Sequence, residues 1–271
     1  MIKVGIIGFG NMGQAIAERI KSDYTVCVFD KDNHKTVHLT GISVCASLSE
    51  LLSRCEEIIL AVKPQDFELV LKEIGSGATH KLFISIAAGI TTAHIEKYLS
   101  LARVVRAMPN IAAIIGEAET CLAKGKYALA EDMEIARQIF GFIGKVWVME
   151  EGLINAATAI SGSGPAYIFY DLEKRGIDGA LVTVDLKEEY IQRLEQAAQA
   201  VGFDGQTALE LANSTVLSSL HLAAGNSPAE LRKKVTSKGG TTEEALKVLC
   251  AGGSWILAAG AAKTRAKELS R

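Results

Sequence analysis

The sequence lacks any surplus of charge, because 29 lysines and arginines nearly balance 31 aspartates and glutamates, for a net charge of −2. It therefore offers no electrostatic reason to bind nucleic acid or an anionic membrane. A long hydrophobic run is also missing, and the longest, 82–90, is too short to cross a bilayer. We expect no nucleic-acid partner, no membrane segment and no secretion signal, since the glycine-broken N-terminus is typical of a first strand.

Patterns for disulfides and metals are absent as well. The five cysteines are scattered and form no CxxC pair, which indicates free thiols in a reducing cytoplasm. The five histidines form no HExxH motif, and His34 and His38 share a helical spacing without a third ligand. We therefore expect a cytoplasmic protein without a metal site. Hydrophobic residues make up 49% of the 271 residues, enough for a core in one large or two ordinary domains.

Short β-branched runs alternate with amphipathic stretches as far as residue 152. Expected strands lie at 2–7, 25–29, 57–62, 81–86, 103–106, 119–123 and 145–149. Expected helices lie at 12–22, 47–54, 67–74, 92–99 and 131–143. Such alternation is typical of βαβ units, so residues 1–152 are predicted to form a dinucleotide-binding α/β domain of the Rossmann type with a mostly parallel sheet.

Residues 153–271 are rich in Ala, Leu and Glu and predict an all-α domain. Its expected helices are 192–201, 205–224, 228–235 and 242–251, with a charged last helix over 263–271. The segment 171–189 departs from this pattern, because Gly176 and Gly179 are poor in a helix interior. Within it, residues 180–186 are predicted to form a strand.

A GxGxxG motif follows the first predicted strand and precedes a helix. Gly8 permits the tight turn, Gly10 lets the backbone approach a pyrophosphate, and Gly13 allows close packing of helix on strand. Asn11 and Met12 complete a helix N-terminus whose free N–H groups favour phosphate. The alternative is a glycine turn in another kind of α/β protein, which this context makes much less favourable.

Asp30 ends the second predicted strand, where an acid that binds the adenosine ribose is expected. Its charge would repel a 2′-phosphate and favours NAD. Lys31, Asn33 and Lys35 follow at once and could bind such a phosphate. The sequence therefore predicts NADH or NADPH and leaves the preference open.

Three later strand ends carry small or loop-forming residues, which would leave room for a flat ring at the carboxyl edge of the sheet. The candidates are Ala61, Val62, Lys63 and Pro64, then Ala87, Ala88 and Gly89, then Met108, Pro109 and Asn110. Any one of them could be an ordinary loop. Together they predict the wall of a nicotinamide site.

Two glycine-rich loops lie in the helical half. Ser163 and Gly164 belong to an SGSGP turn with Pro165 suited to the first turn of a helix; the less favoured alternative is an interdomain hinge. In the second loop, Gly240 precedes Thr241, which together with Glu244 has the spacing of a capping box. Glycines before a helix also expose N–H groups that suit a carboxylate.

These motifs (GFGNMG, AVKPQ, SIAAGI, RAMPN, AISGSGPAY and VTSKGGTTEEAL) resemble those of the pyrroline-5-carboxylate reductases. The resemblance covers nearly the whole chain, and the last two motifs are its most specific part. It implies an enzyme that reduces a small cyclic imine to proline with NADPH or NADH, in the last step of proline synthesis. It also implies a Rossmann domain, a helical dimerisation domain, an active site between them, and homodimers that can assemble into decamers.

The resemblance also implies roles for individual residues. The N–H groups of Gly240 and Thr241 would hold the substrate carboxylate, and the Thr242 hydroxyl would face the ring nitrogen. Ser163, Gly164 and Ser237 would line the pocket. Thr242 has too high a pKa to be a classical general acid, so we expect it to orient the nitrogen while the proton comes from solvent or from an already protonated imine.

The sequence departs from the family pattern at 171–189, which adds about twenty residues inside the dimerisation region, as an extra surface hairpin or an altered dimer arm. The assembly state is therefore open. Lys238 stands where many relatives have proline, and Cys250 where many have glutamate. Neither has a functional interpretation.

Two alternatives stay open. One is another Rossmann imine or hydroxyacid reductase, which would need a catalytic lysine or acid; Lys174 and Lys187 are available but are not expected on a convincing helix. The other is a non-catalytic relative that binds a nucleotide or a metabolite.

Overall fold

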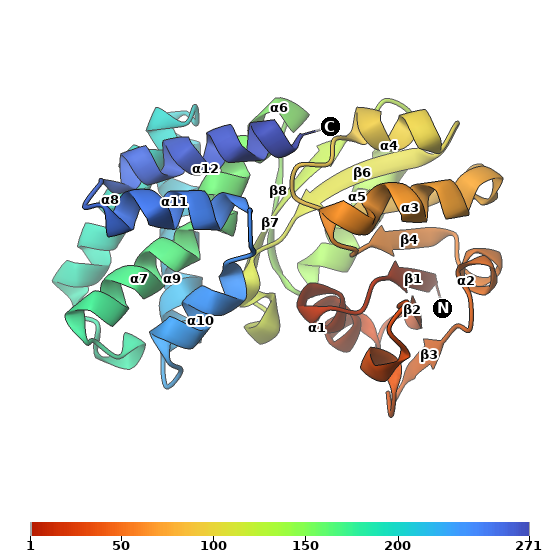
Figure 1. The fold of residues 1–271 in the computed structure, drawn as a ribbon, viewed down its shortest axis with the longest axis horizontal. Helices are drawn as coiled ribbons and strands as arrows, with labels where there is room; N and C mark the ends of the chain where they lie inside the picture. The colour runs from red at the N-terminus through yellow and green to blue at the C-terminus, as the bar shows by residue number, and fades with distance from the viewer. Residues whose placement is uncertain (1, 271) are drawn as a thin grey trace. The chain divides into compact units, whose positions relative to one another are not determined.

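The computed structural model describes residues 2–270, which form two compact units (Figure 1). The first unit contains residues 2–107 and 122–151. The second contains residues 108–121 and 152–270. The first is built around a sheet and the second from helices, so the predicted fold class is confirmed.

The sheet has eight strands in the order β3-β2-β1-β4-β5-β6-β7-β8. They are β1 (Lys3–Ile7), β2 (Thr25–Phe29), β3 (Ile42–Val44), β4 (Glu57–Leu60), β5 (Leu82–Ser85), β6 (Arg103–Met108), β7 (Ala118–Lys124) and β8 (Gly144–Val148). Neighbouring strands from β3 to β6 pair in parallel. The short edge strand β3 had no signal that we recognised in the sequence.

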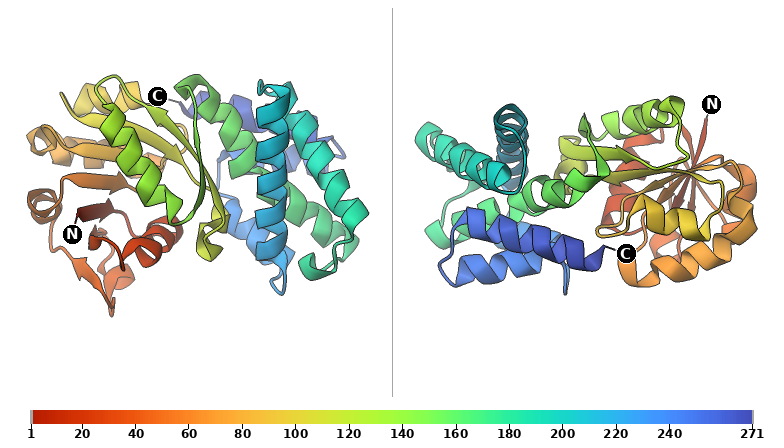
Figure 2. Two further views of the ribbon diagram at one scale, coloured as in Figure 1. Left: turned by 180° about the vertical axis from the view of Figure 1, so that it is seen from behind. Right: turned by 90° about the horizontal axis from the view of Figure 1, so that it is seen from above.

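Five helices accompany the sheet: α1 (Asn11–Ile20), α2 (Leu48–Arg54), α3 (Pro64–Ile74), α4 (Thr92–Tyr98) and α5 (Ala130–Gly141). Crossovers between parallel strands are right-handed, so the direction in which the chain moves along the sheet decides which face a helix covers. Helices α2, α3 and α4 share one face and a common apolar core, with α5 on the other face (Figure 2). The chain reverses direction between β1 and β4, and ligands bind at the carboxyl ends of strands at such a point.

A buried carboxylate fixes the start of α5. Asp132 is fully buried, and its Oδ2 accepts a hydrogen bond of 2.6 Å from the Leu129 N–H. Its Oδ1 accepts from Arg103 Nη1 at 2.8 Å. The Asp132 carboxylate thus joins the first residue of β6 to the start of α5, and the guanidinium of Arg103 balances its charge.

Asp132→Asn should therefore lower the free energy of unfolding by about 2–3 kcal/mol, because an amide cannot accept both bonds and leaves a buried donor unpaired. Urea denaturation measures the change. Glu131→Gln, at the exposed neighbouring position, is the matched control and should change stability by less than about 0.5 kcal/mol. Equal effects of the two variants would contradict this role for Asp132.

The second unit consists mainly of helices. They are α6 (Glu151–Ala157), α7 (Gly164–Arg175), α8 (Val184–Ala200), α9 (Gly205–Ala223), α10 (Pro228–Val235), α11 (Thr241–Cys250) and α12 (Trp255–Leu269). Helix α9 buries residues around most of its circumference, as expected of a central helix. Within 2–270, no helix combines the length and the apolar character needed to span a bilayer.

The predicted strand at 180–186 is wrong. Helix α7 ends at Gly176, which adopts a left-handed conformation with φ of 66°, and a short 3₁₀ turn spans Gly179–Leu181. Helix α8 then begins at Val184, because the Thr183 hydroxyl accepts a hydrogen bond of 3.3 Å from the Leu186 N–H. The β-branched residues thus mark a capped helix start rather than a strand.

Helix α8 is part of the core and not a surface hairpin. The ring of Tyr190 stacks on Trp255 at 5.5 Å between centroids, and Arg193 Cζ lies 4.2 Å from the centroid of the Trp255 ring. The Tyr190 hydroxyl donates to Asp171 at 2.8 Å, which ties α8 back to α7. Burial comes first among the causes that raise the Tyr190 pKa, and this hydrogen bond adds to it.

Candidate active site

The turn after β1 is built against the end of β4. Gly8 has φ of +96°, a left-handed conformation that favours glycine. A Cβ there would lie 2.7 Å from the Ala61 carbonyl oxygen, so no side chain fits. The Gly8 N–H donates to the Phe29 oxygen and the Ala61 N–H to the Ile7 oxygen, each at 2.8 Å. Gly8, Phe9 and Ala61 therefore lie together at the point where the strand order reverses.

The other two glycines of the motif differ in what surrounds them. A Cβ on Gly13 would overlap the Gly8 carbonyl oxygen, whereas a Cβ on Gly10 would meet nothing within 4 Å. Helix α1 begins at Asn11, and its N-cap Gly10 provides no side-chain hydrogen bond. The N–H groups of the first turn, including that of Met12, have no partner inside the helix and suit a phosphate. These backbone features fit a dinucleotide.

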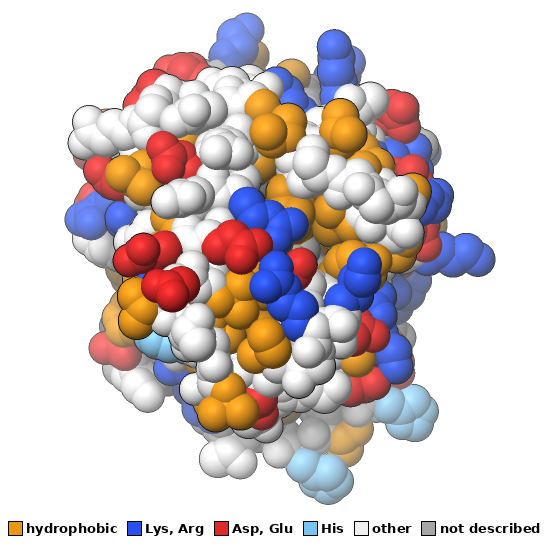
Figure 3. All heavy atoms as spheres, turned by 90° about the vertical axis from the view of Figure 1, so that its left-hand side faces the viewer, with side chains coloured by type: hydrophobic (Ala, Val, Ile, Leu, Met, Phe, Trp, Pro, Cys, Tyr) orange, Lys and Arg blue, Asp and Glu red, His pale blue; other side chains and the backbone are white. Residues whose placement is uncertain are grey.

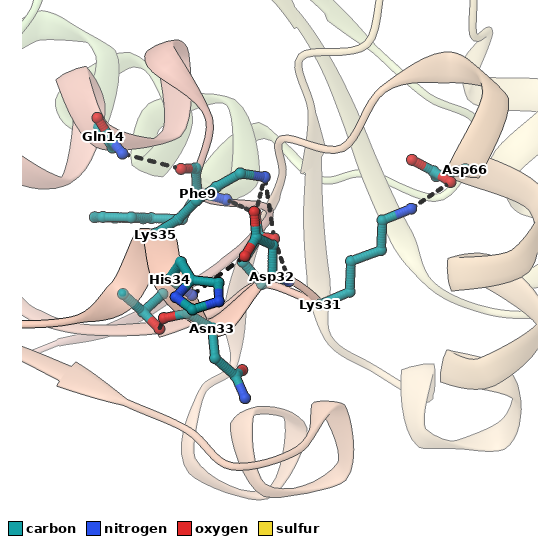
Figure 4. A network of polar contacts seen from close by, with 10 residues as sticks. Phe9, Gln14, Lys31, Asp32, Asn33, His34, Lys35 and Asp66 are labelled. Carbon is teal, nitrogen blue, oxygen red and sulfur yellow. Dashed lines mark hydrogen bonds and ion pairs between the residues drawn. The ribbon is translucent and has the colours of Figure 1, made fainter.

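Asp30 lies directly after β2 and is 8% exposed. Its Oδ2 accepts from the Phe9 N–H at 2.6 Å, and its Oδ1 accepts from the Asp32 N–H at 2.8 Å and from Lys35 Nζ at 3.2 Å (Figure 4). Burial tends to raise the pKa of Asp30, but the two backbone hydrogen bonds and Lys35 outweigh it and hold the pKa below its usual range. The carboxylate is therefore ionised at neutral pH.

The loops after β4 and β5 follow neighbouring strands, as predicted. Pro64 is the first residue of α3, with Lys63 as the N-cap. Gly89 has φ of +78° in the turn after β5, and Ala87 is buried beside it. The structure thus gathers the loops after β1, β4 and β5 at one sheet edge.

The structure places Met108–Asn110 with the second unit rather than with the other predicted cofactor residues. The Met108 Cε lies 3.1 Å from the position that a Cβ on Gly162 would take. Asn110 is 2% exposed, and its Oδ1 accepts from the N–H groups of Ala112 and Glu119 at 3.2 Å each. Met108 and the SGSGP turn are therefore in contact within the second unit.

Three hydroxyls converge in the second unit. Ser163 Oγ lies 3.1 Å from Thr241 Oγ1 and 3.0 Å from Thr242 Oγ1, and all three side chains are buried. A π-helical turn, Thr158–Gly162, presents Ser163 at the start of α7, with the Ser163 N–H donating to the Thr158 oxygen at 2.8 Å. The two glycine-rich loops thus meet, although 78 residues separate Ser163 from Thr241 in the chain.

The predicted capping box of Thr241 and Glu244 is wrong. Helix α11 begins at Thr241, so its N-cap is Gly240, which has no side chain to cap with. The carboxylate of Glu243, three residues after this N-cap, accepts from the Gly239 N–H at 2.8 Å instead. No reciprocal capping box therefore forms at this helix start, and Glu243 fixes the preceding glycine instead.

Gly240 is held by its own loop. Its N–H donates to the Ser237 oxygen at 3.0 Å, and a Cβ there would overlap the Ser237 hydroxyl. The first-turn N–H groups of Thr241 and Thr242 have no partner inside the helix, and Gly240 provides no cap. An anion at this helix start would therefore be held by Thr241 and Thr242 rather than by Gly240.

Sequence reasoning missed Arg265, which lies on α12. Its Nε donates to the Gly239 oxygen at 2.9 Å and so ties the GGTT loop, residues 239–242, to α12. No motif marks it, since its role follows from the packing of α12 on α11. Lys238 in the same loop is exposed, as is Cys250 at the end of α11, and nothing in the structure assigns a role to either.

Two buried thiols lie away from these loops, and the described residues hold no metal cluster. Within 2–270, no three His, Cys, Asp or Glu side chains are grouped so as to hold a metal ion. Burial raises the pKa of Cys45 to about 11 and that of Cys55 to about 12, so both thiols stay protonated. Lys174 and Lys187 do lie on helices, α7 and α8, contrary to expectation.

Comparison with known proteins decides the family. The family model for NADP oxidoreductase, coenzyme F420-dependent, matches residues 3–89, and that for pyrroline-5-carboxylate reductase dimerisation matches residues 188–269. The pyrroline-5-carboxylate reductase of Methanosarcina acetivorans is 36% identical, over 99% of this chain and 98% of its own length. The chain belongs to the pyrroline-5-carboxylate reductase family. Bacillus subtilis pyrroline-5-carboxylate reductase 2 is 31% identical over 92% of the chain and 87% of its own length.

Solved structures of this reductase family agree with the fold. That of the Coxiella burnetii pyrroline-5-carboxylate reductase covers 99% of this chain and 98% of its own, with 32% identity and a TM-score of 0.65. The Plasmodium falciparum pyrroline carboxylate reductase, solved with NADP bound, matches 100% of this chain and 98% of its own, with 25% identity and a TM-score of 0.65. The dimerisation match begins inside α8, so α7 and the turn after it lie outside both family models.

Proposed function

We propose that this chain reduces 1-pyrroline-5-carboxylate to L-proline with NADH or NADPH, as the last step of proline synthesis. Ser163, Thr241 and Thr242, whose hydroxyls meet at the uncapped start of α11, carry the proposal. A substrate with one carboxylate and one ring nitrogen needs an anion site and a hydrogen-bonding group side by side. The start of this helix supplies both kinds of group.

In this proposal the second unit holds the substrate. The N–H groups of Thr241 and Thr242 bind the carboxylate, where the helix dipole adds to the attraction. The Thr242 hydroxyl orients the ring nitrogen, and Ser163, 3.0 Å away, fixes the rotamer of Thr242. Gly164 and Ser237 shape the pocket, and Met108 borders the SGSGP turn through Gly162.

The first unit holds the cofactor, with the pyrophosphate on the turn Gly8–Gly13 and the start of α1. The adenosine ribose would lie at Asp30, and the loops after β4 and β5 would leave space for the nicotinamide. When bound, the reduced nicotinamide supplies the hydride that adds to the C=N carbon. The nitrogen keeps a proton that comes from solvent or from an already protonated imine, so the protein needs to position and bind rather than to act as a strong acid.

Turnover tests this proposal directly. Purified protein is mixed with pyrroline-5-carboxylate and either NADH or NADPH, and the absorbance of the reduced nicotinamide is followed. Oxidation with this substrate and none with 2-keto acids supports the proposal. Turnover of 2-keto acids or of unrelated imines alone would point to another Rossmann reductase. Cofactor binding without any turnover would point to a non-catalytic relative.

We also propose that the chain works as a homodimer in the cytoplasm, divided functionally into 1–152 and 153–271. The dimerisation match supports the homodimer, as does the surface of the helical unit, where hydrophobic side chains lie exposed among charged ones (Figure 3). The large exposed ones in this unit include Leu181, Val184, Leu209, Ile256 and Leu257. Light scattering after gel filtration distinguishes a dimer, a decamer and a monomer.

A further inference from the structure

The end of β2 carries a compact charged network around Asp30, whose partners Phe9, Asp32 and Lys35 are labelled in Figure 4. One oxygen of its carboxylate accepts from the Phe9 N–H at 2.6 Å, and Phe9 lies inside the glycine turn. The other accepts from the Asp32 N–H at 2.8 Å. The carboxylate is thus fixed to the pyrophosphate turn itself and cannot swing away from a ligand bound there.

Beyond these two bonds, each carboxylate oxygen of Asp30 also accepts from Lys35 Nζ, at 3.2 Å for Oδ1 and 3.3 Å for Oδ2, and the Lys35 side chain is 41% exposed and free to move aside. Ribose hydroxyls are donors and can take the place of this ammonium group. A 2′-phosphate is mostly deprotonated at neutral pH, so it has no hydrogen to donate to Asp30. Its negative charge would also lie against the carboxylate of Asp30, which is 8% exposed. The site therefore matches a ribose with free hydroxyls.

The nearby cations are already engaged with acids. Lys35 Nζ lies 3.2 Å from Asp30 Oδ1, and Lys31 Nζ lies 2.8 Å from Asp66 Oδ1. Lys31 extends toward Asp66 and away from Lys35 (Figure 4). With Asp32, three carboxylates face two ammonium groups, so the neighbourhood carries one negative charge in excess.

We infer that this chain selects NADH over NADPH, that Asp30 determines the choice, and that Lys35 is a phosphate ligand held inactive by its ion pair with Asp30. The inference rests on the proposed cofactor site. The charge of Lys35 should therefore affect NADPH binding only after the charge of Asp30 has been removed.

The test measures binding by calorimetry in the absence of substrate. The unmodified protein should bind NADH roughly 10- to 100-fold more tightly than NADPH, as expected for like charges brought together. Asp30→Asn keeps an acceptor for the Phe9 N–H but removes the charge, so the preference should shift toward NADPH by a similar factor. Asp30→Ser is a second variant with a smaller side chain, and it should shift the preference in the same direction.

Lys35→Met should affect NADPH affinity differently in the two backgrounds. Combined with Asp30→Asn it should abolish the gain in NADPH affinity, whereas alone it should leave NADPH binding no stronger than in the unmodified protein. Lys21→Met is the matched control, because Lys21 also forms an ion pair, with Glu18 at 2.6 Å, away from this network. It should change neither affinity.

Equal affinity of the unmodified protein for the two cofactors, or an unchanged ratio in both Asp30 variants, would overturn the inference. The proposed function fails separately. Selective NADH binding without reduction of pyrroline-5-carboxylate would refute the function and leave the selectivity intact. Reduction with NADPH preferred would do the reverse.

Discussion

Gly13→Ala should reduce cofactor affinity by roughly 100-fold or more and also destabilise the free protein by about 1–3 kcal/mol, the range for overpacking a tight contact. The reason is steric, because the new Cβ would overlap the Gly8 carbonyl oxygen, which is backbone and cannot turn away. Helix α1 would have to move off β1, and the turn would lose its shape. Calorimetry with NADH and thermal unfolding without cofactor measure the two effects.

Gly10→Ala is the informative partner of this variant. A Cβ at Gly10 meets nothing within 4 Å, and its φ of −81° suits any residue, so the free protein should unfold as before. Cofactor affinity should nevertheless fall, because the methyl group would occupy the space that the pyrophosphate needs. Normal cofactor binding by Gly10→Ala would show that the pyrophosphate does not lie over this residue.

Thr242→Val should lower kcat with pyrroline-5-carboxylate by about 100-fold, the size of effect seen when a positioned donor is removed from a developing charge. Valine keeps the shape of threonine, so folding and cofactor affinity should be unchanged. Steady-state kinetics and calorimetry measure these quantities. Without its hydroxyl, the side chain can neither orient the ring nitrogen nor pair with Ser163 at 3.0 Å.

Thr242→Ser restores the hydroxyl and should recover most of the activity. Thr241→Val should cost less, since in our proposal Thr241 contributes its N–H and not its hydroxyl. A kcat of Thr242→Val equal to that of the unmodified protein would remove Thr242 from the mechanism. An equal loss in both valine variants would instead indicate that the hydroxyl cluster acts only as a unit.

The sequence was sufficient for most of the first unit, though not for the short strand β3, because its signals are local. A glycine motif, a strand before it and a helix after it lie within a few residues of one another, so Gly8 and Asp30 could be placed on the correct strand ends. The second unit depends on contacts between distant residues. The meeting of Ser163 with Thr242 and the hold of Arg265 on Gly239 leave no periodic pattern, so spacing alone could not predict them.

The errors have the same physical origin. Residues 180–186 have strand-forming side chains, yet Thr183 finds a helix N–H to cap, and local hydrogen bonding overrides propensity there. No capping box forms at the start of α11, because its N-cap is Gly240, which has no side chain, and the Glu243 carboxylate accepts from the Gly239 N–H instead. In both cases the local hydrogen bonds decide the structure, rather than side-chain propensity or sequence spacing.

The hold of Arg265 on Gly239 has a consequence for the order of events during synthesis. The glycine turn, Asp30 and the strands around them are complete once residue 151 has left the ribosome, and N-terminal domains generally fold first. The GGTT loop is complete only when α12 has been synthesised, because Arg265 lies 26 residues after Gly239. A nascent chain should therefore bind its cofactor well before it can recognise its substrate.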